Sequence, residues 1–441
     1  CHMPPAKKKP TSTSEVRRAA ILGGNRIPFA RSNGPYADAS NQDMFTAALD
    51  GLVARFGLGG ETVDEVAGGA VLKHARDFNL MRESVMSSAL SDFTPAYDVQ
   101  QACDTGLQAI NLVANKIKLG DIEVGIAGGV DTTSDAPLAV GDQLRRALIK
   151  ANAARSNADR LKALASVRPG HLAPDQPRNA EPRTGLSMGD HQAITTKQWG
   201  ISREAQDELA ARSHQNLAAA YERGFMDDLM TPYLGLTRDH NLRPDSSVEK
   251  LAKLQPVFAK GEGATMTAGN STPLTDGAST VLLSSEDWAK KRKLPVLAFL
   301  SHVVTAAVPY VHGDEGLLMA PVYAVPKLLE KSGLTLQDFD YYEIHEAFAG
   351  QVLTTLAAWE DDEYCKEKLG LKKALGPIDR DKLNVNGSSL AAGHPFAATG
   401  GRIIATLAKM LHERDAGPPA RGLVSICAAG GQGVVAVVEA A

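Results

Sequence analysis

The chain has 441 residues, of which 44% are hydrophobic and 22% charged, and its net charge is −4. This composition is that of a globular protein with room for two or three domains, and the charge gives no reason to expect nucleic acid or an anionic membrane as the main partner. No apolar run in the sequence reaches the roughly 18–20 residues that a membrane-spanning helix needs.

The N-terminal segment and the cysteines indicate the environment in which the protein works. Residues 1–15 are rich in lysine, proline, serine and threonine and lack the apolar stretch of a secretory signal, so we expect a disordered tail. The cysteines are too few for a disulfide framework, and none has the spacing of a metal ligand. We therefore expect a reducing, cytoplasmic location, no metal, and free thiols at Cys1, Cys103, Cys365 and Cys427.

From residue 19 to residue 127, apolar segments alternate with segments of helical periodicity. The strand expected before Cys103 leads directly into that residue, and a helix follows it. We expect strands at 19–22, 66–72, 96–99 and 124–127, and helices at 44–56, at 81–90 and from Cys103 to about 118.

The C-terminal part repeats this order of elements. One stretch keeps its register, since Gly57 precedes Val63 by the same spacing as Gly333 precedes Phe339. We therefore predict an α/β fold with two similar halves that face each other, built on mainly parallel sheets with helices outside. The expected strands of this part are 297–304, 341–345, 423–427 and 434–438, the helices are 321–331, 348–359 and 398–411, and a glycine-rich loop spans 386–395.

Residues 140–261 interrupt the repeat. Basic side chains crowd the first part of this segment, from Arg145 to Arg168, and prolines follow. We interpret 140–261 as an inserted, partly helical loop domain, so that the first half comprises 16–139 and 262–292 and the second half comprises 293–441. The basic run most simply forms a solvated face, and contact with the phosphates of a ligand or with a partner protein is the alternative.

Cys103 lies in the segment Gln-Gln-Ala-Cys-Asp-Thr-Gly, between a predicted strand and the first turn of a helix. The unpaired N–H groups and the dipole of a helix N-terminus favour a thiolate there. The alternative is a buried structural cysteine, which is the commoner state of a lone cysteine. The position after a strand favours a functional role, because α/β proteins bind ligands at the carboxyl ends of their strands.

Three residues of the second half complete a candidate catalytic set at the matching edge. His394 follows the glycine-rich loop and has a side chain that can take a thiol proton. Cys427 ends a strand, and the Ala-Ala-Gly-Gly-Gln-Gly that follows is a turn that can aim backbone N–H groups at an oxyanion. His345 ends another strand and could donate to a developing enolate, directly or through water. Taken alone, a histidine in the position of His394 is more often a structural loop residue, and His345 is equally explained as a core histidine at the edge of a loop.

Together these motifs resemble those of the thiolase family, over nearly the whole chain from Val16 to Ala441. The resemblance includes the segments 200–208 (Gly-Ile-Ser-Arg-Glu-Ala-Gln-Asp-Glu), 266–272 (Met-Thr-Ala-Gly-Asn-Ser-Thr) and 276–278 (Asp-Gly-Ala). Histidine at position 345 is similar to the trifunctional-enzyme β-subunit type and related 3-ketoacyl-CoA thiolases (acetyl-CoA C-acyltransferases) of fatty-acid oxidation, since most thiolases have asparagine there.

The resemblance implies a fold and an activity. The fold is a five-layered αβαβα core made of two duplicated βαβαβαββ halves, with an inserted loop domain. The activity is CoA-dependent thiolytic cleavage of 3-oxoacyl-CoA to acetyl-CoA and a shortened acyl-CoA, through an acyl-cysteine, in fatty-acid β-oxidation. Coenzyme A is then a co-substrate, and no permanently bound cofactor is expected. The resemblance further implies a homodimer or homotetramer, with a hydratase/dehydrogenase α subunit as a candidate partner of the basic insert.

The resemblance also implies roles for individual residues. Cys103 is the acylated nucleophile, His394 its activating base and Cys427 the second acid/base, while His345 supports the enolate. The backbone N–H groups of Cys103 and Ala429 form the oxyanion hole. The positions that match residues in contact with CoA or substrate are Met188, Ala268, Ser271, Thr272 and Phe348.

Asp104 departs from the family pattern, because a small uncharged residue usually follows the nucleophile. A carboxylate beside a thiolate opposes ionisation of the thiol, unless the helix N-terminus stabilises the carboxylate as a cap would. Two alternatives therefore stay open. One is a thiolase-like protein that binds acyl-CoA without catalysis. The other is a ketoacyl-synthase-like condensing enzyme, which shares the duplicated fold but lacks the second cysteine.

Overall fold

The computed structural model of the chain describes residues 16–414 and 420–441, so the tail predicted at 1–15 lies outside the described residues. The fold is α/β and is built around one large mixed sheet. Within the described ranges, none of the helices combines the length and the apolar character of a membrane span.

The first half contains all the elements expected between residues 19 and 127. After a long insertion it is completed by β8 (Thr275–Ser284), which is followed by the short α9 (Glu286–Lys291). β8 is buried along its whole length but was not predicted, because threonine, serine and aspartate interrupt its apolar residues. The preceding elements are β1 (Ala20–Arg26), β2 (Ala30–Arg31), α1 (Asn41–Phe56), β3 (Glu65–Gly68), α2 (Leu80–Ser87), β4 (Ala96–Asp98), α3 (Thr105–Leu119) and β5 (Val124–Asp131).

The second half also contains every strand and helix expected from the sequence. The glycine-rich loop expected at 386–395 includes a single helical turn, α13 (Ser389–Ala392). The other elements are β9 (Ala298–Ala307), α10 (Ala320–Ser332), β10 (Tyr341–Ile344), α11 (Ala349–Glu360), α12 (Asp362–Glu367), α14 (Thr399–Glu413), β11 (Arg421–Ala428) and β12 (Gln432–Ala440).

The strand order shows the duplication directly. The sheet runs β10-β11-β12-β9-β1-β8-β5-β3-β4, with β2 paired to β8. Read outward from the centre, β9-β12-β11-β10 matches β1-β8-β5-β3, and each matched pair of neighbours has the same parallel or antiparallel sense. The counterpart of β4 is reduced to an isolated bridge between Tyr342 and Leu383. The two halves meet edge to edge, where β1 pairs with β9.

The expectation of mainly parallel sheets was wrong. Among the named strands of the described residues, parallel pairing is limited to β3 with its neighbours β4 and β5, and to β10 with β11. The other strand pairs of the sheet are antiparallel. Helical crossovers connect the parallel strands, whereas β11 turns directly into β12, and a tight turn reverses the direction of the chain. In the first half, β8 takes the place that β12 has in the second.

Three hydrophobic clusters define five layers, in which the strands of each half of the sheet form one β layer. One cluster packs α1 and α2 against the strands of the first half, and another packs α10 and α11 against the strands of the second half. The third cluster joins side chains of α3 and α14, such as Leu107 and Ile403, to strands of both halves. The helices α3 and α14 therefore form a central layer, which gives the αβαβα arrangement that the family resemblance implied.

The two central helices touch at glycines, and this contact sets the distance between the halves. A Cβ on Gly400 would lie 2.3 Å from the backbone N of Leu107, and a Cβ on Gly106 would lie 2.5 Å from the carbonyl O of Ala397. Neither distance is possible in a close-packed interior without a shift of the backbone. Glycine at both positions lets the first turns of α3 and α14 meet backbone to backbone.

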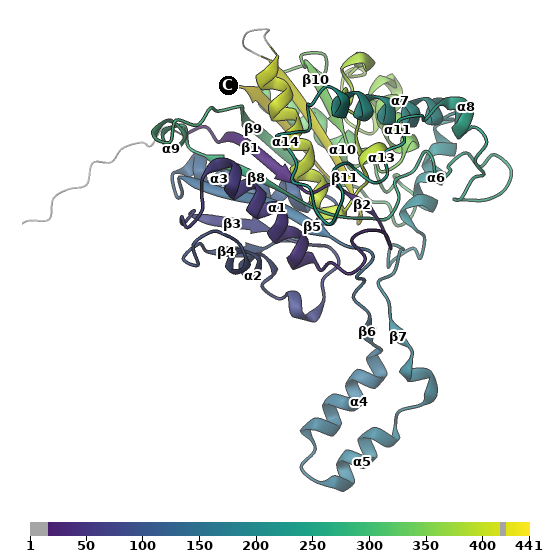
Figure 1. The fold of residues 1–441 in the computed structure, drawn as a ribbon. Coiled ribbons are helices and arrows are strands. Elements are labelled where there is room, and N and C mark those ends of the chain that lie inside the picture. The colour runs from purple at the N-terminus through teal and green to yellow at the C-terminus, as the bar shows by residue number, and fades with distance from the viewer. Residues whose placement is uncertain (1–15, 415–419) are drawn as a thin grey trace, which may run out of the picture.

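The inserted segment has two parts with different surroundings. Its first part is a helical hairpin that projects from the body of the molecule (Figure 1). This projecting hairpin, residues 139–175, consists of β6 (Ala139–Val140), α4 (Asp142–Ala153), α5 (Asn157–Ala165) and β7 (Pro174–Asp175). In the second part, α6 (Met188–Gln198) and α7 (Arg203–Glu222) pack on α11, and α8 (Val248–Leu251) packs on α7. The domain boundaries at 140 and 261 stay a prediction.

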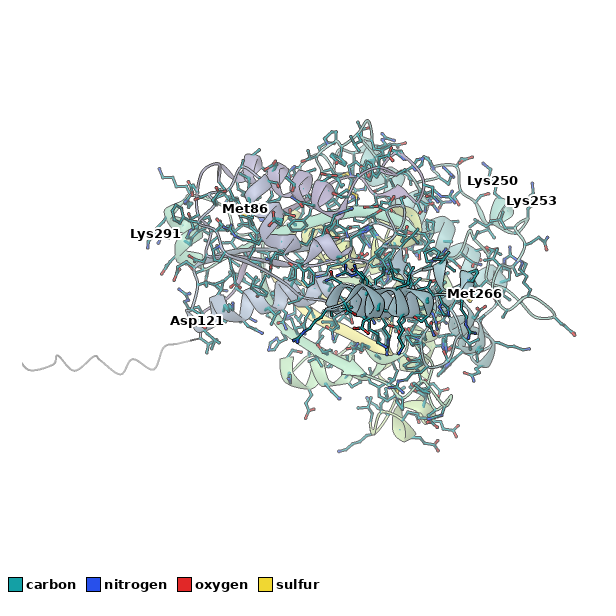
Figure 2. The ribbon with its side chains drawn as sticks, turned by 90° about the horizontal axis from the view of Figure 1, so that it is seen from below. Met86, Asp121, Lys250, Lys253, Met266 and Lys291 are labelled. Atoms are coloured by element: carbon teal, nitrogen blue, oxygen red, sulfur yellow. The ribbon has the colours of Figure 1, made fainter. Side chains whose placement is uncertain are left out.

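The projecting hairpin concentrates positive charge and apolar surface. It has seven Lys and Arg residues and three Asp residues, a net charge of +4 in a chain whose net charge is −4. Leu148, Ile149 and Leu161 on its helices are 46%, 57% and 69% exposed. Figure 2, in which the hairpin lies in front of the body, shows labelled lysines in and near α8 and in α9 at opposite ends of the molecule. The basic run predicted from the sequence therefore lies on the projecting hairpin and not on the surface of the body (Figure 1).

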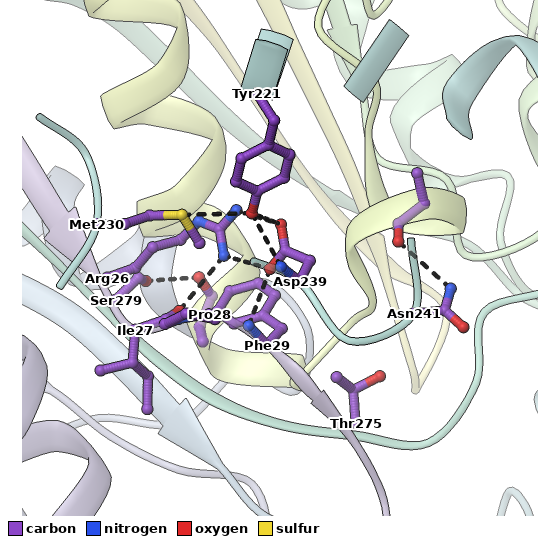
Figure 3. A network of polar contacts seen from close by, with 12 residues as sticks. Arg26, Ile27, Pro28, Phe29, Tyr221, Met230, Asp239, Asn241, Thr275 and Ser279 are labelled. Carbon is purple, nitrogen blue, oxygen red and sulfur yellow. Dashed lines mark hydrogen bonds and ion pairs between the residues drawn. The ribbon is translucent and has the colours of Figure 1, made fainter. Parts of the chain in front are cut away.

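A buried ion pair fastens the second part of the insertion to the first half (Figure 3). The guanidinium of Arg26, at the end of β1, donates to both carboxylate oxygens of Asp239 at 2.6 and 2.7 Å. The hydroxyl of Tyr221 in α7 also donates to Asp239, at 2.7 Å. A buried charge paired in this way stabilises one arrangement of the chain. Close by, the amide of Asn241 donates to the carbonyl of Leu390 in α13 at 2.9 Å, which connects this loop to the glycine-rich loop.

Gly400→Ala is expected to lower the melting temperature by about 1–3 °C, because overpacking of a close contact costs about 1–3 kcal/mol. The added Cβ would have to push α14 away from the backbone N of Leu107. Thermal unfolding followed by circular dichroism measures the effect. Gly59→Ala is the control, since a Cβ at Gly59 would meet no atom of the described residues within 4 Å. Equal melting temperatures for the two variants would contradict the proposed role of the glycine contact.

Candidate active site

Cys103 is held at a sharp turn between β4 and α3, and it is 3% exposed. The preceding Ala102 has a φ of +47°, in the left-handed region that non-glycine residues rarely adopt. Thr105 Oγ1 accepts a hydrogen bond from the backbone N of Gln101 at 2.9 Å and donates to the carbonyl of Ala102 at 2.7 Å. Backbone strain of this kind is typical of functional sites, where the surrounding structure holds one residue in place.

His394 lies just before α14, in the second half, and its ring contacts the sulfur of Cys103. His394 Nε2 is 3.1 Å from Cys103 Sγ, and His394 Nδ1 is 2.5 Å from Thr399 Oγ1. The preceding Gly393 has a φ of +98°, and a Cβ there would lie 2.7 Å from Thr275 Cγ2, so the position requires glycine. The structure thus brings together a thiol and an imidazole that are 291 residues apart in the chain.

His345 follows β10 directly and is completely buried. Its ring centroid is 4.1 Å from that of His394. His345 Nδ1 is 2.6 Å from Ser389 Oγ in α13. His345 Nε2 is buried and has no hydrogen-bond partner among the described residues. Because buried polar atoms are nearly always paired, this nitrogen is available to a bound molecule.

Cys427 lies near the end of β11 and is 1% exposed. The side chain of Phe348 belongs to the apolar cluster around it. Burial raises the pKa of the Cys427 thiol well above its usual range, and the negative charges that Cys103 and Asp104 carry when ionised raise it further. The two thiols are therefore near enough for the ionisation of one to affect the other.

Burial has a larger effect on the pKa of the Cys103 thiol than the backbone N–H groups that contact it. Burial, and the charge of Asp104 when it is ionised, raise the pKa of this thiol, and hydrogen bonds from the backbone N–H groups of Ala429 and of Cys103 itself offset this only in part. The favourable effect of the helix N-terminus on a thiolate, expected from the sequence, is therefore smaller than the opposing effect of burial. Burial and the positive charge of Arg402 lower the pKa of His394 to about 3. At neutral pH the site holds a neutral thiol against a neutral imidazole.

Asp104 is not the helix cap that the sequence left open. It occupies the position before α3, but its side chain accepts no capping hydrogen bond. Both carboxyl oxygens are buried and have no hydrogen-bond partner among the described residues. Burial raises the pKa of this carboxyl well above its usual range. The neutral form of the carboxyl is therefore favoured at neutral pH, and the carboxyl opposes the neighbouring thiolate only at the alkaline pH at which it ionises.

A pocket of about 280 Å³ lies against Cys103. Its lining joins three parts of the chain: Cys103 from the first half, Ala429 from the second half, and the base of the projecting hairpin with Leu138 and residues 176–181. The pocket can therefore hold a ligand that reaches from the nucleophile toward the hairpin. Within residues 16–414 and 420–441, no group of three or more His, Cys, Asp or Glu side chains is arranged to hold a metal ion.

The five positions expected to contact CoA or substrate lie in different surroundings. Met188 lines the pocket. Phe348 belongs to the same apolar cluster as Met188 and Cys427. The other three positions lie outside the lining of this pocket, and their binding role stays a prediction; they are Ala268, Ser271 and Thr272.

Sequence reasoning missed the residues that orient the two histidines. The hydroxyl groups of Thr399 and Ser389 contact the two rings, and Arg402 donates to Ser389 at 2.9 Å. Gln101 Nε2 donates to Gln432 Oε1 at 2.9 Å and so ties the turn before the nucleophile to the turn between β11 and β12. The hydroxyl residues were visible near the glycine-rich loop in the sequence. The contact of Arg402 was not, since it depends on how α14 packs.

Comparisons with known proteins point to one family. Residues 19–287 match the family model described as thiolase, N-terminal domain, and residues 294–440 match thiolase, C-terminal domain. The chain is 40% identical over 440 residues to a 3-ketoacyl-CoA thiolase of Yersinia pestis (strain Pestoides F), a match that covers 98% of this chain and 99% of that protein. Among solved structures it is similar to an acetyl-CoA acetyltransferase of Bacillus anthracis, with a TM-score of 0.79 and 30% identity. It is also similar to human mitochondrial 3-ketoacyl-CoA thiolase, with a TM-score of 0.78 and 28% identity, and both matches cover 97% of this chain and 100% of the solved chain.

Alkylation of Cys103 by iodoacetamide is expected to have a pH midpoint above 9.0, the ordinary pKa of a cysteine thiol, because burial raises the pKa of this thiol. Asp104→Asn is expected to move the midpoint to lower pH, since a thiolate and a carboxylate are then no longer forced to share one buried site. Mass spectrometry of the peptide that contains Cys103 gives the rate at each pH.

The matched control is Asp121→Asn, which removes an exposed carboxylate after the same helix and is expected to leave the midpoint unchanged. A wild-type midpoint below pH 7 would show that the helix N-terminus outweighs burial. No shift in Asp104→Asn would show that the carboxyl has no effect on the thiol.

Proposed function

This chain belongs to the thiolase family, and we propose that it catalyses the cleavage of 3-oxoacyl-CoA by coenzyme A to acetyl-CoA and a shortened acyl-CoA. The main support is the 3.1 Å distance between Cys103 Sγ and His394 Nε2 at a pocket. A thiol beside a neutral imidazole is the arrangement that acyl transfer through a cysteine thioester requires. The second buried thiol, Cys427, supports a reaction in which a proton is also transferred to the α-carbon of the acetyl-CoA enolate.

In this proposal the reaction begins with proton transfer from Cys103 to His394. His394 Nε2 accepts the thiol proton while the sulfur attacks the C3 carbonyl of the 3-oxoacyl group, so no thiolate has to persist in the buried resting site. For Nε2 to accept, Nδ1 carries the ring proton and donates to Thr399 Oγ1. The backbone N–H groups of Cys103 and Ala429, which stabilise the sulfur, hold the negative oxygen of the tetrahedral intermediate.

The break of the C2–C3 bond leaves an acyl group on Cys103 and the enolate of acetyl-CoA. The thiol of Cys427 protonates the enolate carbon, while His345 hydrogen-bonds the enolate oxygen. Coenzyme A then enters, and the Cys427 thiolate takes its thiol proton. The CoA sulfur attacks the acyl thioester, and Cys103 leaves and recovers its proton from His394. Both cysteines return to the neutral form in which they began.

The proposal includes the setting in which the enzyme works. CoA is a co-substrate and contacts Met188, Phe348 and the segment with Ala268, Ser271 and Thr272. The name of the Yersinia pestis relative supports a place in fatty-acid β-oxidation. The chain works in the cytoplasm, where thiols stay reduced, as a homodimer or homotetramer.

The projecting hairpin is proposed to dock a hydratase/dehydrogenase α subunit. The exposed apolar side chains on α4 and α5 support an interface, because a purely solvated face has no need of them. The net positive charge of the hairpin suits an acidic surface on the partner. Since the base of the hairpin lines the pocket beside Cys103, a subunit docked there would be near the entry of the substrate.

Cys103→Ser is expected to reduce the thiolysis of 3-oxoacyl-CoA at least about 1,000-fold, because the hydroxyl is a far weaker nucleophile and leaving group than the thiol. The assay follows the loss of enolate absorbance over a series of acyl chain lengths. With wild-type enzyme and no free CoA, mass spectrometry is expected to find an acyl group on Cys103.

Cys365→Ser is the matched control, since Cys365 is a buried free cysteine in α12, outside the site, and this variant should keep its activity. Undiminished thiolysis by Cys103→Ser would reject the proposal. Cys427→Ser addresses the ketoacyl-synthase alternative, because full condensation activity without the second thiol would favour a synthase. Binding of acyl-CoA by the wild type without turnover would favour a protein that only binds.

A further inference from the structure

Only one of the two ring nitrogens of His345 has a hydrogen-bond partner among the described residues. Its Nδ1 is 2.6 Å from Ser389 Oγ, while its Nε2 is buried without a partner among the described residues. A neutral imidazole carries one proton, and the position of that proton decides whether Nε2 is a donor or an acceptor. The partners of Ser389 determine which of the two forms is present.

The Ser389 hydroxyl has two hydrogen-bonding neighbours, a guanidinium that can only donate and an imidazole nitrogen that can donate or accept. Arg402 Nη2 lies 2.9 Å from Ser389 Oγ, and a guanidinium only donates, so the oxygen accepts there. The one proton of the hydroxyl then needs an acceptor. Ser389 is completely buried, and its side-chain contacts within the described ranges are those to Arg402 and His345. If His345 Nδ1 also donated, the hydroxyl proton would be buried without an acceptor, which native structures avoid.

The arrangement that pairs every group has the Ser389 hydroxyl donating to His345 Nδ1. The ring proton then lies on Nε2, because the ring is neutral: burial, the charge that His394 carries when it is protonated, and the positive charge of Arg402 lower its pKa well below the usual range. His394 must have the opposite form, with its proton on Nδ1, to accept from Cys103. Two histidines whose ring centroids are 4.1 Å apart thus carry their protons on different nitrogens.

We propose that Arg402 and Ser389 are positioning residues that lock His345 in the form with the proton on Nε2, so that this N–H is a permanent hydrogen-bond donor to the thioester oxygen of the bound acyl-CoA. This inference rests on the proposed function and deepens it. The ring gives up no proton; it stabilises the negative charge that grows on the oxygen when the C2–C3 bond breaks. Arg402 is itself buried and also donates to Ser388 Oγ at 3.2 Å.

Ser389→Ala is expected to lower kcat/KM for thiolysis about 10- to 100-fold, mostly through kcat, since the donor acts on charge that appears in the transition state. Without the hydroxyl, the ring proton of His345 is free to move to Nδ1. The unprotonated Nε2 is then a hydrogen-bond acceptor and cannot donate to the enolate oxygen. The matched control is Ser388→Ala, which removes the neighbouring hydroxyl bonded to Arg402 but does not touch His345. This control should stay within about threefold of wild type.

A second pair of variants separates a positioning role from a structural one. In His345→Asn, the side-chain amide offers an N–H donor whatever residue stands at 389, so adding Ser389→Ala should change kcat/KM by less than about threefold. A loss of 10-fold or more in both backgrounds would mean that Ser389 only supports the fold, and would overturn the proposal. So would Ser389→Ala with the same activity as Ser388→Ala.

Nitrogen-15 NMR of the labelled histidine rings reads the proton position without any catalysis. The resonances of His345 are identified as those that are present in the wild type and absent in His345→Asn. They are expected to show Nδ1 as a hydrogen-bond acceptor and Nε2 as the protonated nitrogen. The opposite assignment in the wild type would overturn the proposal. This NMR result does not depend on turnover, so it tests the position of the proton even if the proposed function is wrong. A Cys103→Ser variant that keeps its activity would show that the proposed function is wrong.

Discussion

The site depends on one contact, the meeting of α3 and α14 backbone to backbone at Gly106 and Gly400. Cys103 lies just before α3, and His394 lies just before α14. Since the first turns of the two helices touch, the residues that precede them come within 3.1 Å of each other. The duplication makes this possible: the two halves place equivalent helices in one central layer, and their starts meet at the middle of the molecule.

A second constraint is burial, which governs the chemistry of the groups that this contact brings together. Burial raises the pKa values of Cys103, Cys427 and Asp104 and lowers those of both histidines. All of them therefore rest in their neutral forms, and charge appears only while a proton moves between them. A neutral resting thiol is also a poor target for oxidants and alkylating agents, since the thiolate is the reactive form.

The sequence predicted what depends on local pattern and missed what depends on packing. Periodicity located the strands and helices that flank Cys103 and His394, and the family resemblance supplied the five layers. The strand β8 was missed because its buried positions include polar residues such as Thr280, whose hydroxyl donates to the carbonyl of Asn25. The raised pKa of the Cys103 thiol was not foreseen, because burial is a property of the tertiary structure. The Arg402 contact to Ser389 was out of reach for the same reason, since nothing in the spacing of the chain places them together.

The most direct measurement for this account is a cross-link between the two thiols of the site. Dibromobimane joins two cysteines only when their sulfurs are adjacent, and mass spectrometry of the digested protein identifies the joined peptides. At alkaline pH, where both thiols ionise, the account predicts one bridged product, between the peptide with Cys103 and the peptide with Cys427. Peptides that each carry the reagent singly, with no bridge between them, would contradict the claim that the two halves of the chain build one site.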